Sequence, residues 1–176
     1  MKKVLVFGAS SSRNSINKKF ASYAATQLDN VEVHLIDLND FEMPIYSVDR
    51  QEADGIPEAA QRFKSHIREA DGIIMSLAEH NGSYAAAFKN ILDWASKAEK
   101  SMWLGKPMLV LSTSPGGRGG QTVLDLAKVY FGYMDGKVMG HFALPQFYQN
   151  FSEEKGITDE KLQQQFKEQL QLFAGA

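Results

Sequence analysis

Strand-length apolar runs alternate with longer segments of helical periodicity along the chain. This alternation restricts the fold most, because strands separated by covering helices build a parallel sheet that is buried on both faces. The expected strands are residues 4–7, 31–36, 72–77, 108–111 and 138–144. We therefore predict an α/β fold of three layers, a doubly wound five-stranded parallel sheet. Its ligand should lie beyond the carboxyl ends of the strands, at the switch in strand order.

The helical segments carry apolar residues at spacings of three and four, so each should turn one face to the sheet. They are expected at about residues 15–28, from 57, at about 83–97, from about 120, and from a cap at Thr158. The residues predicted to be buried in four of them are Ile16, Phe20, Tyr23 or Ala24, Leu28; Ala60, Phe63, Ile67, Ala70; Val123, Leu126 or Ala127, Tyr130; and Leu162, Phe166, Leu170, Phe173. A chain of 176 residues with one such series is predicted to be a single domain, residues 1–176.

The helix expected at residues 83–98 has two apolar stripes. One consists of Phe88, Ile91, Leu92 and Ala95, and the other of Ala87, Trp94 and Ala98. The sheet can cover one stripe, and a partner subunit could cover the other, unless Trp94 only widens the first. The preceding loop, residues 37–56, is long enough to be an interface arm or lid, or an ordinary surface excursion. We predict a homodimer or homotetramer with both segments near the interface.

Composition excludes several classes of function. A formal charge of −2 gives no reason to expect nucleic acid or an acidic membrane surface as a partner. The absence of cysteine excludes disulfides, thiol catalysis and thiolate metal sites, and it fits a reducing compartment. The first apolar run ends at Phe7, which is too short for an export signal or a membrane span. We expect a cytoplasmic protein.

A hydroxyl-rich turn follows the first expected strand. Residues 8–17 include four serines, two asparagines and Arg13, but no carboxylate. Because a helix should begin within this turn, free backbone N–H groups and the positive end of the helix dipole converge there and favour a monophosphate. A second interpretation is that Ser15 or Asn14 only caps the helix. The turn matches neither a triphosphate-binding loop nor a dinucleotide fingerprint.

Two further loops should open on the same edge of a parallel sheet. Residues 78–83 read Ala-Glu-His-Asn-Gly-Ser, and residues 112–120 read Ser-Thr-Ser-Pro-Gly-Gly-Arg-Gly-Gly. Their glycines could allow the backbone to approach a flat ligand, or could form only a tight turn. Together the three loops predict a phosphate cup beside a slot that suits a heteroaromatic ring.

Several motifs of the chain occur together and in order. They are Ser15-Ile16-Asn17, Glu79-His80-Asn81-Gly82-Ser83, Phe88-Lys89-Asn90-Ile91-Leu92-Asp93-Trp94, Gly105-Lys106-Pro107 and Ser114-Pro115-Gly116-Gly117, with Asp40, Pro44 and Tyr46 in the long loop. In this set the chain resembles the NAD(P)H-dependent FMN reductase family, a flavodoxin-like group that contains bacterial quinone, azo-dye and chromate reductases. The resemblance runs from the first strand to Gly120, and the final third shares only the fold-level pattern.

The resemblance implies a flavodoxin-like strand order of 2-1-3-4-5, FMN as cofactor, and NADPH or NADH as co-substrate. It implies that Ser10, Ser12, Ser15 and Asn17 hold the FMN phosphate, with Ile16 beside them. It also implies that Glu79, His80, Asn81 and Gly82 line the isoalloxazine ring, and that Ser114, Pro115, Gly116 and Gly117 contact its other edge. The chain departs from the family pattern at Ala78, His80, Ala85 and Ala86, and in the position of Arg13.

The implied activity passes electrons from reduced nicotinamide through FMN to a quinone-like or other small acceptor, or to free flavin. The flavin carries this chemistry, so we predict no catalytic side chain and no metal. His80 could stack on the flavin or donate to it, and Arg13 or Arg118 could attract the extra phosphate of NADPH. An alternative is a flavodoxin-type carrier that docks protein partners, which the near-neutral charge argues against. A hydrolase using Ser10 or Ser114 is weaker still, since no Gly-x-Ser-x-Gly elbow occurs.

Overall fold

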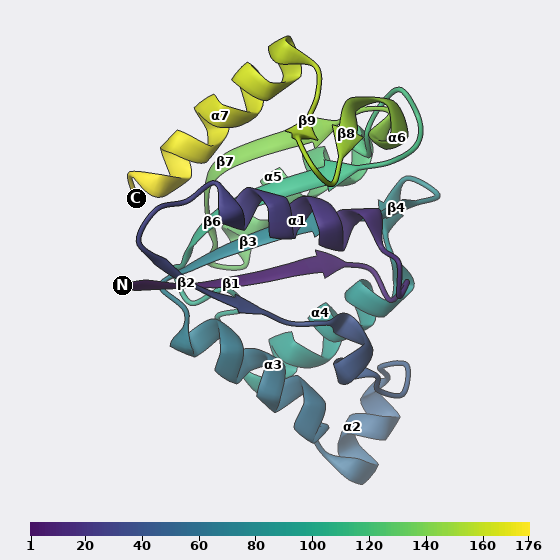
Figure 1. Cartoon of the computed structure of the whole chain (residues 1–176). Helices are drawn as coiled ribbons and strands as arrows, with labels where there is room; N and C mark the ends of the chain where they lie inside the picture. Colours follow the sequence, from purple (N-terminus) through teal and green to yellow (C-terminus); the bar gives the residue numbers. More distant parts are fainter.

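The computed structural model describes residues 1–176, and five parallel strands form its central sheet (Figure 1). The strands are β1 (Lys2–Ala9), β2 (Val31–Leu35), β3 (Gly72–Leu77), β6 (Pro107–Thr113) and β7 (Lys137–Leu144). Their order in the sheet is β2-β1-β3-β6-β7, which is the expected 2-1-3-4-5 when the five are counted alone. The predicted fold class and strand order are therefore confirmed. Two short antiparallel hairpins lie outside the sheet: β4 (Glu79–His80) with β5 (Ser83–Tyr84), and β8 (Phe151–Ser152) with β9 (Gly156–Ile157).

Helices cover both faces of the sheet. They are α1 (Ile16–Thr26), the 3-10 turn η1 (Leu38–Phe41), α2 (Val48–Asp54), α3 (Glu58–Glu69), α4 (Ala86–Ala98), α5 (Gln121–Tyr133), α6 (Phe147–Asn150) and α7 (Glu160–Ala174). Helices α1 and α7 lie on one face, and α3 and α4 lie on the other (Figure 1). No helix has the length and apolar character that a bilayer crossing requires.

The alternation of side chains along β1 divides the core into two clusters. Leu5 and Phe7 join the cluster that contains the buried residues of α3, α4 and α5. Val4 and Val6 point to the opposite face and join the cluster of α1 and α7. Both faces of β1, β3 and β6 are therefore buried, which is why these central strands appear in the sequence as continuous apolar runs. The edge strand β2 has no buried residue.

Three details of the predicted helices were wrong. The last helix is capped by Asp159, whose side chain accepts from the Leu162 N–H at 2.8 Å, and not by Thr158. In α5 the buried stripe passes through Leu124 and Phe131, so Tyr130, one residue off this stripe, is 54% exposed. The third helix begins at Ala86, because the residues before it pair in the β4–β5 hairpin.

Trp94, the largest residue of the second stripe of α4, is covered within the chain, which corrects the expectation that a partner subunit could cover it; Ala98 of the same stripe is exposed. Trp94 is 1% exposed, and its indole Nε1 donates to the carbonyl of Pro44 at 2.7 Å. Tyr46 packs edge-on against the same indole at 5.0 Å between ring centroids. Asn90 also donates to the carbonyls of Met43 and Pro44, both at 3.1 Å. The first part of the long loop is thus fastened to α4.

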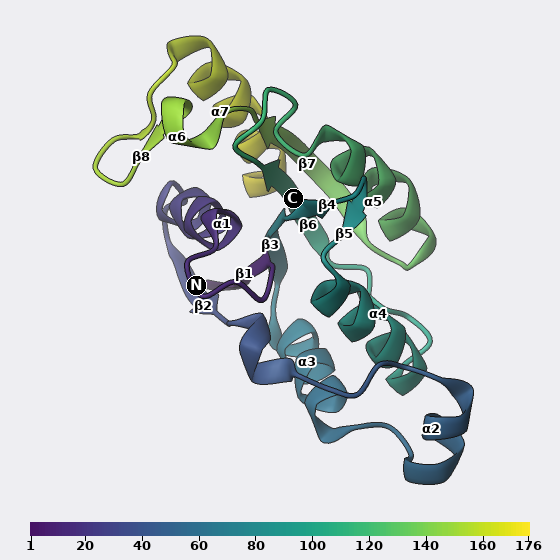
Figure 2. The same cartoon turned by 90° about the vertical axis from the view of Figure 1, so that its right-hand side faces the viewer.

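The second part of the long loop contains α2, which has no buried residue. Figure 2 shows α2 at the end of the molecule that is remote from α6 and α7. Ile45 and Val48 expose 66% and 58% of their surface in this region. The long loop is therefore an anchored arm that carries exposed apolar side chains.

Candidate functional site

The carboxyl ends of β1, β3 and β6 meet at one edge of the sheet, and the loops that follow them enclose a cavity of about 200 Å³. The predicted meeting of three loops is confirmed. The lining residues are Ser10, Ser12, Asn14, Ser15, Ile16 and Asn17 of the first loop, Ala78, Glu79 and His80 of the second, Thr113, Ser114 and Pro115 of the third, and Tyr148. Four residues with predicted site roles are not among them: Asn81, Gly82, Gly116 and Gly117.

The first loop combines the two interpretations of its sequence. Ser15 caps α1, since its hydroxyl accepts from the Lys18 N–H at 3.2 Å. The N–H groups of Ile16 and Asn17 have no acceptor in the chain, and the first turn of α1 contains no acidic residue. The loop therefore keeps two free donors at the positive end of a helix dipole, as an anion site requires.

The close approach of α1 to β1 depends on Gly8. A side-chain carbon at this position would lie 2.3 Å from the backbone nitrogen of Lys18, far closer than van der Waals contact allows. The missing side chain lets the amino end of α1 sit directly against the end of the strand. The free N–H groups thus come to the edge where the other loops converge.

The side chain of Asn17 turns inward and joins three elements. Its amide Nδ2 donates to the Thr113 carbonyl at 3.2 Å, while its Oδ1 accepts from the Ser76 hydroxyl at 2.7 Å and the Thr113 N–H at 3.1 Å. The residue is 3% exposed. This side chain consequently fixes the loop to β3 and β6, which leaves the backbone N–H of Asn17 as its donor to a ligand.

The second loop forms a tight hairpin beside the cavity. Asn81 and Gly82 occupy its two turn positions with φ of 52° and 74°, the pattern of a two-residue turn that favours Asn-Gly. This role at the tip explains why neither lines the cavity, whereas His80, one position earlier, does. The Glu79 carboxylate accepts from the Val123 N–H of α5 at 2.9 Å. Because Gly120 provides no capping side chain for α5, Glu79 fills that structural role.

The third loop is joined to α6, the element that brings Tyr148 to the cavity. The N–H of Phe147 donates to the Ser114 carbonyl at 3.1 Å, and that of Gln146 to the Gly116 carbonyl at 2.9 Å. Phe147 is buried and stacks on Phe151, while Tyr148 remains 73% exposed. The sequence interpretation missed Tyr148. It could have been found, because residues after the last parallel strand open on the same edge as the other three loops.

Comparison with known proteins identifies the family of the chain. The model of the family described as NADPH-dependent FMN reductase matches residues 2–149. The chain belongs to the NADPH-dependent FMN reductase family. It is 35% identical over 119 residues to a 2-hydroxy-1,4-benzoquinone reductase of a Burkholderia species, covering 66% of this chain and 63% of that protein. It is 36% identical over 120 residues to a quinone reductase of Pseudomonas putida, covering 66% and 62%.

The chain therefore matches slightly less than two thirds of the length of these two relatives. A solved structure covers the chain more fully. FerB, a flavoenzyme NAD(P)H:(acceptor) oxidoreductase from Paracoccus denitrificans, superposes with a TM-score of 0.81 at 27% identity, over 99% of this chain and 96% of that one. The similarity thus extends to the final third, where the sequence showed only a fold-level pattern.

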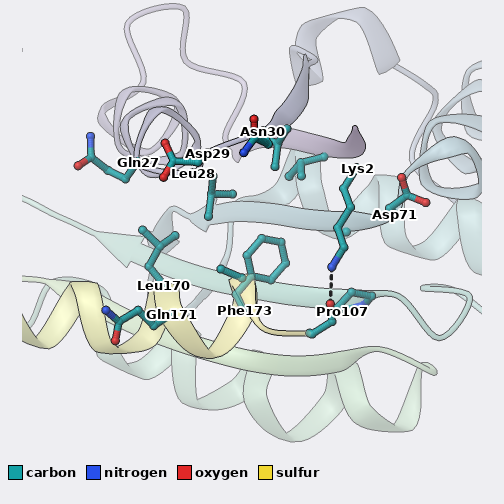
Figure 3. A pocket seen from close by; sticks show the side chains of 15 residues that line it. Lys2, Gln27, Leu28, Asp29, Asn30, Asp71, Pro107, Leu170, Gln171 and Phe173 are labelled. Atoms are coloured by element: carbon teal, nitrogen blue, oxygen red, sulfur yellow. Dashed lines mark hydrogen bonds between the residues drawn. The ribbon is translucent and has the colours of Figure 1, made fainter.

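This family member also has a cavity of about 450 Å³ at the opposite edge of the sheet, the amino-edge cavity (Figure 3). Its lining includes the first residues of three strands, Gly72, Pro107 and Val31, together with Leu170 and Phe173 of α7. The cavity is larger than the one at the carboxyl edge, but the three loops lie at the other end of the strands. We therefore do not assign this cavity to flavin binding, although it is larger.

Proposed function

We propose that this chain is an FMN-dependent NAD(P)H oxidoreductase that delivers electrons to a small quinone-like acceptor or to free flavin. The observation that carries this proposal is that free backbone donors and hydroxyl groups from three loops line one cavity at the carboxyl edge of the sheet. The family membership supports the same assignment. When bound, FMN supplies the redox chemistry by accepting a hydride from reduced nicotinamide and passing the electrons on.

The donors of the cavity fit a flavin phosphate. Ser15 and Ser10 are largely buried, and the N–H groups of Ile16 and Asn17 are free at the start of α1. The only carboxylate in the lining, that of Glu79, is engaged with the N–H of Val123. A phosphate at the serine loop would meet donors and a helix dipole of the right sign. We assign its contacts to Ser10, Ser12, Ser15 and the backbone at residues 16–17.

The remainder of the cavity fits a flat heteroaromatic ring. The N–H groups of Ser114 and Gly116 have no acceptor within the chain, so this loop can donate to ring carbonyls or nitrogens. His80 faces the cavity from the opposite loop and is exposed, which leaves it free to contact a ring or a substrate. These residues bind and orient, and we assign no proton transfer to a side chain.

The proposed assembly is a cytoplasmic homodimer or homotetramer. Trp94 does not support it, since the chain itself covers this residue. Ile45 and Val48 do, because an anchored arm with exposed apolar side chains suits contact with a second copy. Sedimentation of the wild type and of Val48→Asp tests this proposal: the variant should dissociate, and an unchanged profile would reject the arm as an interface.

Two measurements on the purified protein test the function. The absorption spectrum should show bound flavin, and oxidation of NADPH or NADH should accelerate when benzoquinone is added. A flavodoxin-type carrier would bind FMN but leave the nicotinamide unoxidised. Failure to take up FMN in a titration would reject both assignments.

A further inference from the structure

A second cavity, of about 490 Å³, adjoins the phosphate end of the proposed flavin site. Asn14 and Ser15 line both cavities, so the second one continues from the loop to which we assign the flavin phosphate. Its walls are the outer face of α1 and the segment around β8, which lie side by side in Figures 1 and 2. The lining residues are Arg13, Asn14, Ser15, Lys18, Lys19, Ser22, Tyr23, Thr26, Phe151 and Glu153.

The charge of this second cavity suits a phosphorylated ligand. Three cationic side chains and one carboxylate line it, although the chain as a whole has a net charge of −2. Arg13 is exposed and belongs to none of the ion pairs in the structure. Lys19 pairs with Glu153, but the two side chains are 46% and 76% exposed, so a phosphate can compete for this lysine. Lys18 pairs with Asp37, which is not among the lining residues.

The far end of the cavity is aromatic. Tyr23 and Phe151 pack edge to face at 5.4 Å between their centroids, and both contribute to the wall. The hydroxyl group of Ser22 stands nearby on the same face of α1. A cationic entrance next to an aromatic wall with a hydroxyl suits a phosphate joined to a nucleoside.

We propose that this second cavity binds the adenylate half of FAD, so that the chain accepts FAD as well as FMN. The inference rests on the proposed function, because FAD is FMN whose phosphate carries an AMP group through a pyrophosphate bond. With the flavin phosphate at Ser15, the added phosphate lies at Arg13 and Lys19, and the adenosine lies along Tyr23 and Phe151. A free nicotinamide dinucleotide is the competing occupant, but only FAD makes the two adjoining cavities parts of one ligand site.

Titration calorimetry of the flavin-free protein with FMN, FAD and riboflavin tests the proposal. The wild type should bind FAD with a dissociation constant within about tenfold of that for FMN. Lys19→Glu should weaken FAD about tenfold, by replacing attraction of the second phosphate with repulsion, and leave FMN unchanged. Ser22→Phe, which fills the cavity, should likewise weaken FAD and leave FMN unchanged. Lys167→Glu makes the same change of net charge on an exposed face of α7 and should affect neither ligand.

The outcomes separate the two proposals. FAD that binds no better than riboflavin while FMN binds tightly would overturn the adenylate site and leave the proposed function intact. Equal effects of Lys19→Glu and Lys167→Glu on FAD would also overturn it. If the Lys19 variant instead raised the KM for NADPH and left FAD binding unchanged, the cavity would belong to the nicotinamide dinucleotide. If the wild type did not bind FMN, the proposed function itself would be rejected.

Discussion

The two edges of the sheet each carry a cavity, but they present opposite backbone charge. At the carboxyl edge α1 begins with free N–H groups. At the amino edge the C-cap of α1, Gln27, and the last residues of α7 line the cavity, with Asp29 and Asp71 beside them (Figure 3). Lys2 also lines it, and its ammonium group donates to the Ala176 carbonyl. Because the helix dipole is positive at the amino end and negative at the carboxyl end, the dipoles favour a phosphate at the carboxyl edge. The amino-edge cavity, of about 450 Å³, is larger than the cavity of about 200 Å³ between the three loops, so the direction of the helices identifies the flavin site better than the volume of a single cavity does.

The largest effect is expected when a negative charge is added at the amino end of α1. Ser15→Asp keeps a good capping side chain, but it places a carboxylate against the proposed phosphate, so FMN should bind roughly a thousandfold more weakly. Riboflavin, which lacks the phosphate, should bind to the variant as to the wild type. Fluorescence titration measures both ligands.

Gln27→Glu is the matched control, since it adds a carboxylate at the other end of the same helix, beside the amino-edge cavity. FMN affinity should be unchanged. If the two variants lost FMN binding equally, the contrast between the edges would be wrong.

The second test asks what the amino edge contributes. Phe173 is 6% exposed and packs against Gly72, where an added side-chain carbon would lie 3.0 Å from its ring. Phe173→Ala should lower the free energy of unfolding by about 3 kcal/mol, with FMN affinity unchanged. Urea unfolding and FMN titration measure the two quantities. Its neighbour Leu172 is 55% exposed, so Leu172→Ala should change neither. An FMN site that weakened in folded Phe173→Ala protein would give the amino edge a part in binding.

The sequence predicted the sheet and the meeting of its loops because strand runs and loop composition are local signals. Side-chain direction was not readable in the same way. Asn17 and Glu79 both have the residue type of a ligand contact, yet their side chains bond to Thr113 and Val123. Their partners lie 96 and 44 positions away, and no local pattern specifies such distant pairs. Trp94 was misassigned for the same reason, because its cover comes from Pro44 and Tyr46 of a loop without regular periodicity.

The third test concerns this division of roles within the first loop. Asn17→Ala leaves the Ser76 hydroxyl and the Thr113 N–H buried without their partner, so the free energy of unfolding should fall by about 2 kcal/mol. Asn14→Ala, three residues earlier and exposed, should leave stability unchanged. Urea unfolding of the flavin-free proteins measures the difference. Equal stability of the two variants would show that the inward bonds of Asn17 do not hold the edge together.

The smallest expected effect belongs to Tyr148, which lines the carboxyl-edge cavity from outside the three predicted loops. The backbone next to Tyr148 is fixed by the hydrogen bond from the Phe147 N–H to the Ser114 carbonyl. The exposed ring of Tyr148 therefore loses little conformational freedom when it covers a ligand. Tyr148→Ala should weaken FMN about fivefold, by loss of this cover. Tyr148→Phe keeps the ring and removes the hydroxyl. If this variant binds FMN as the wild type does, the ring makes the contribution; if it binds FMN as weakly as Tyr148→Ala does, the hydroxyl makes it. If Tyr148→Ala itself bound FMN like the wild type, Tyr148 would have no part in the flavin site, and the three loops alone would account for binding.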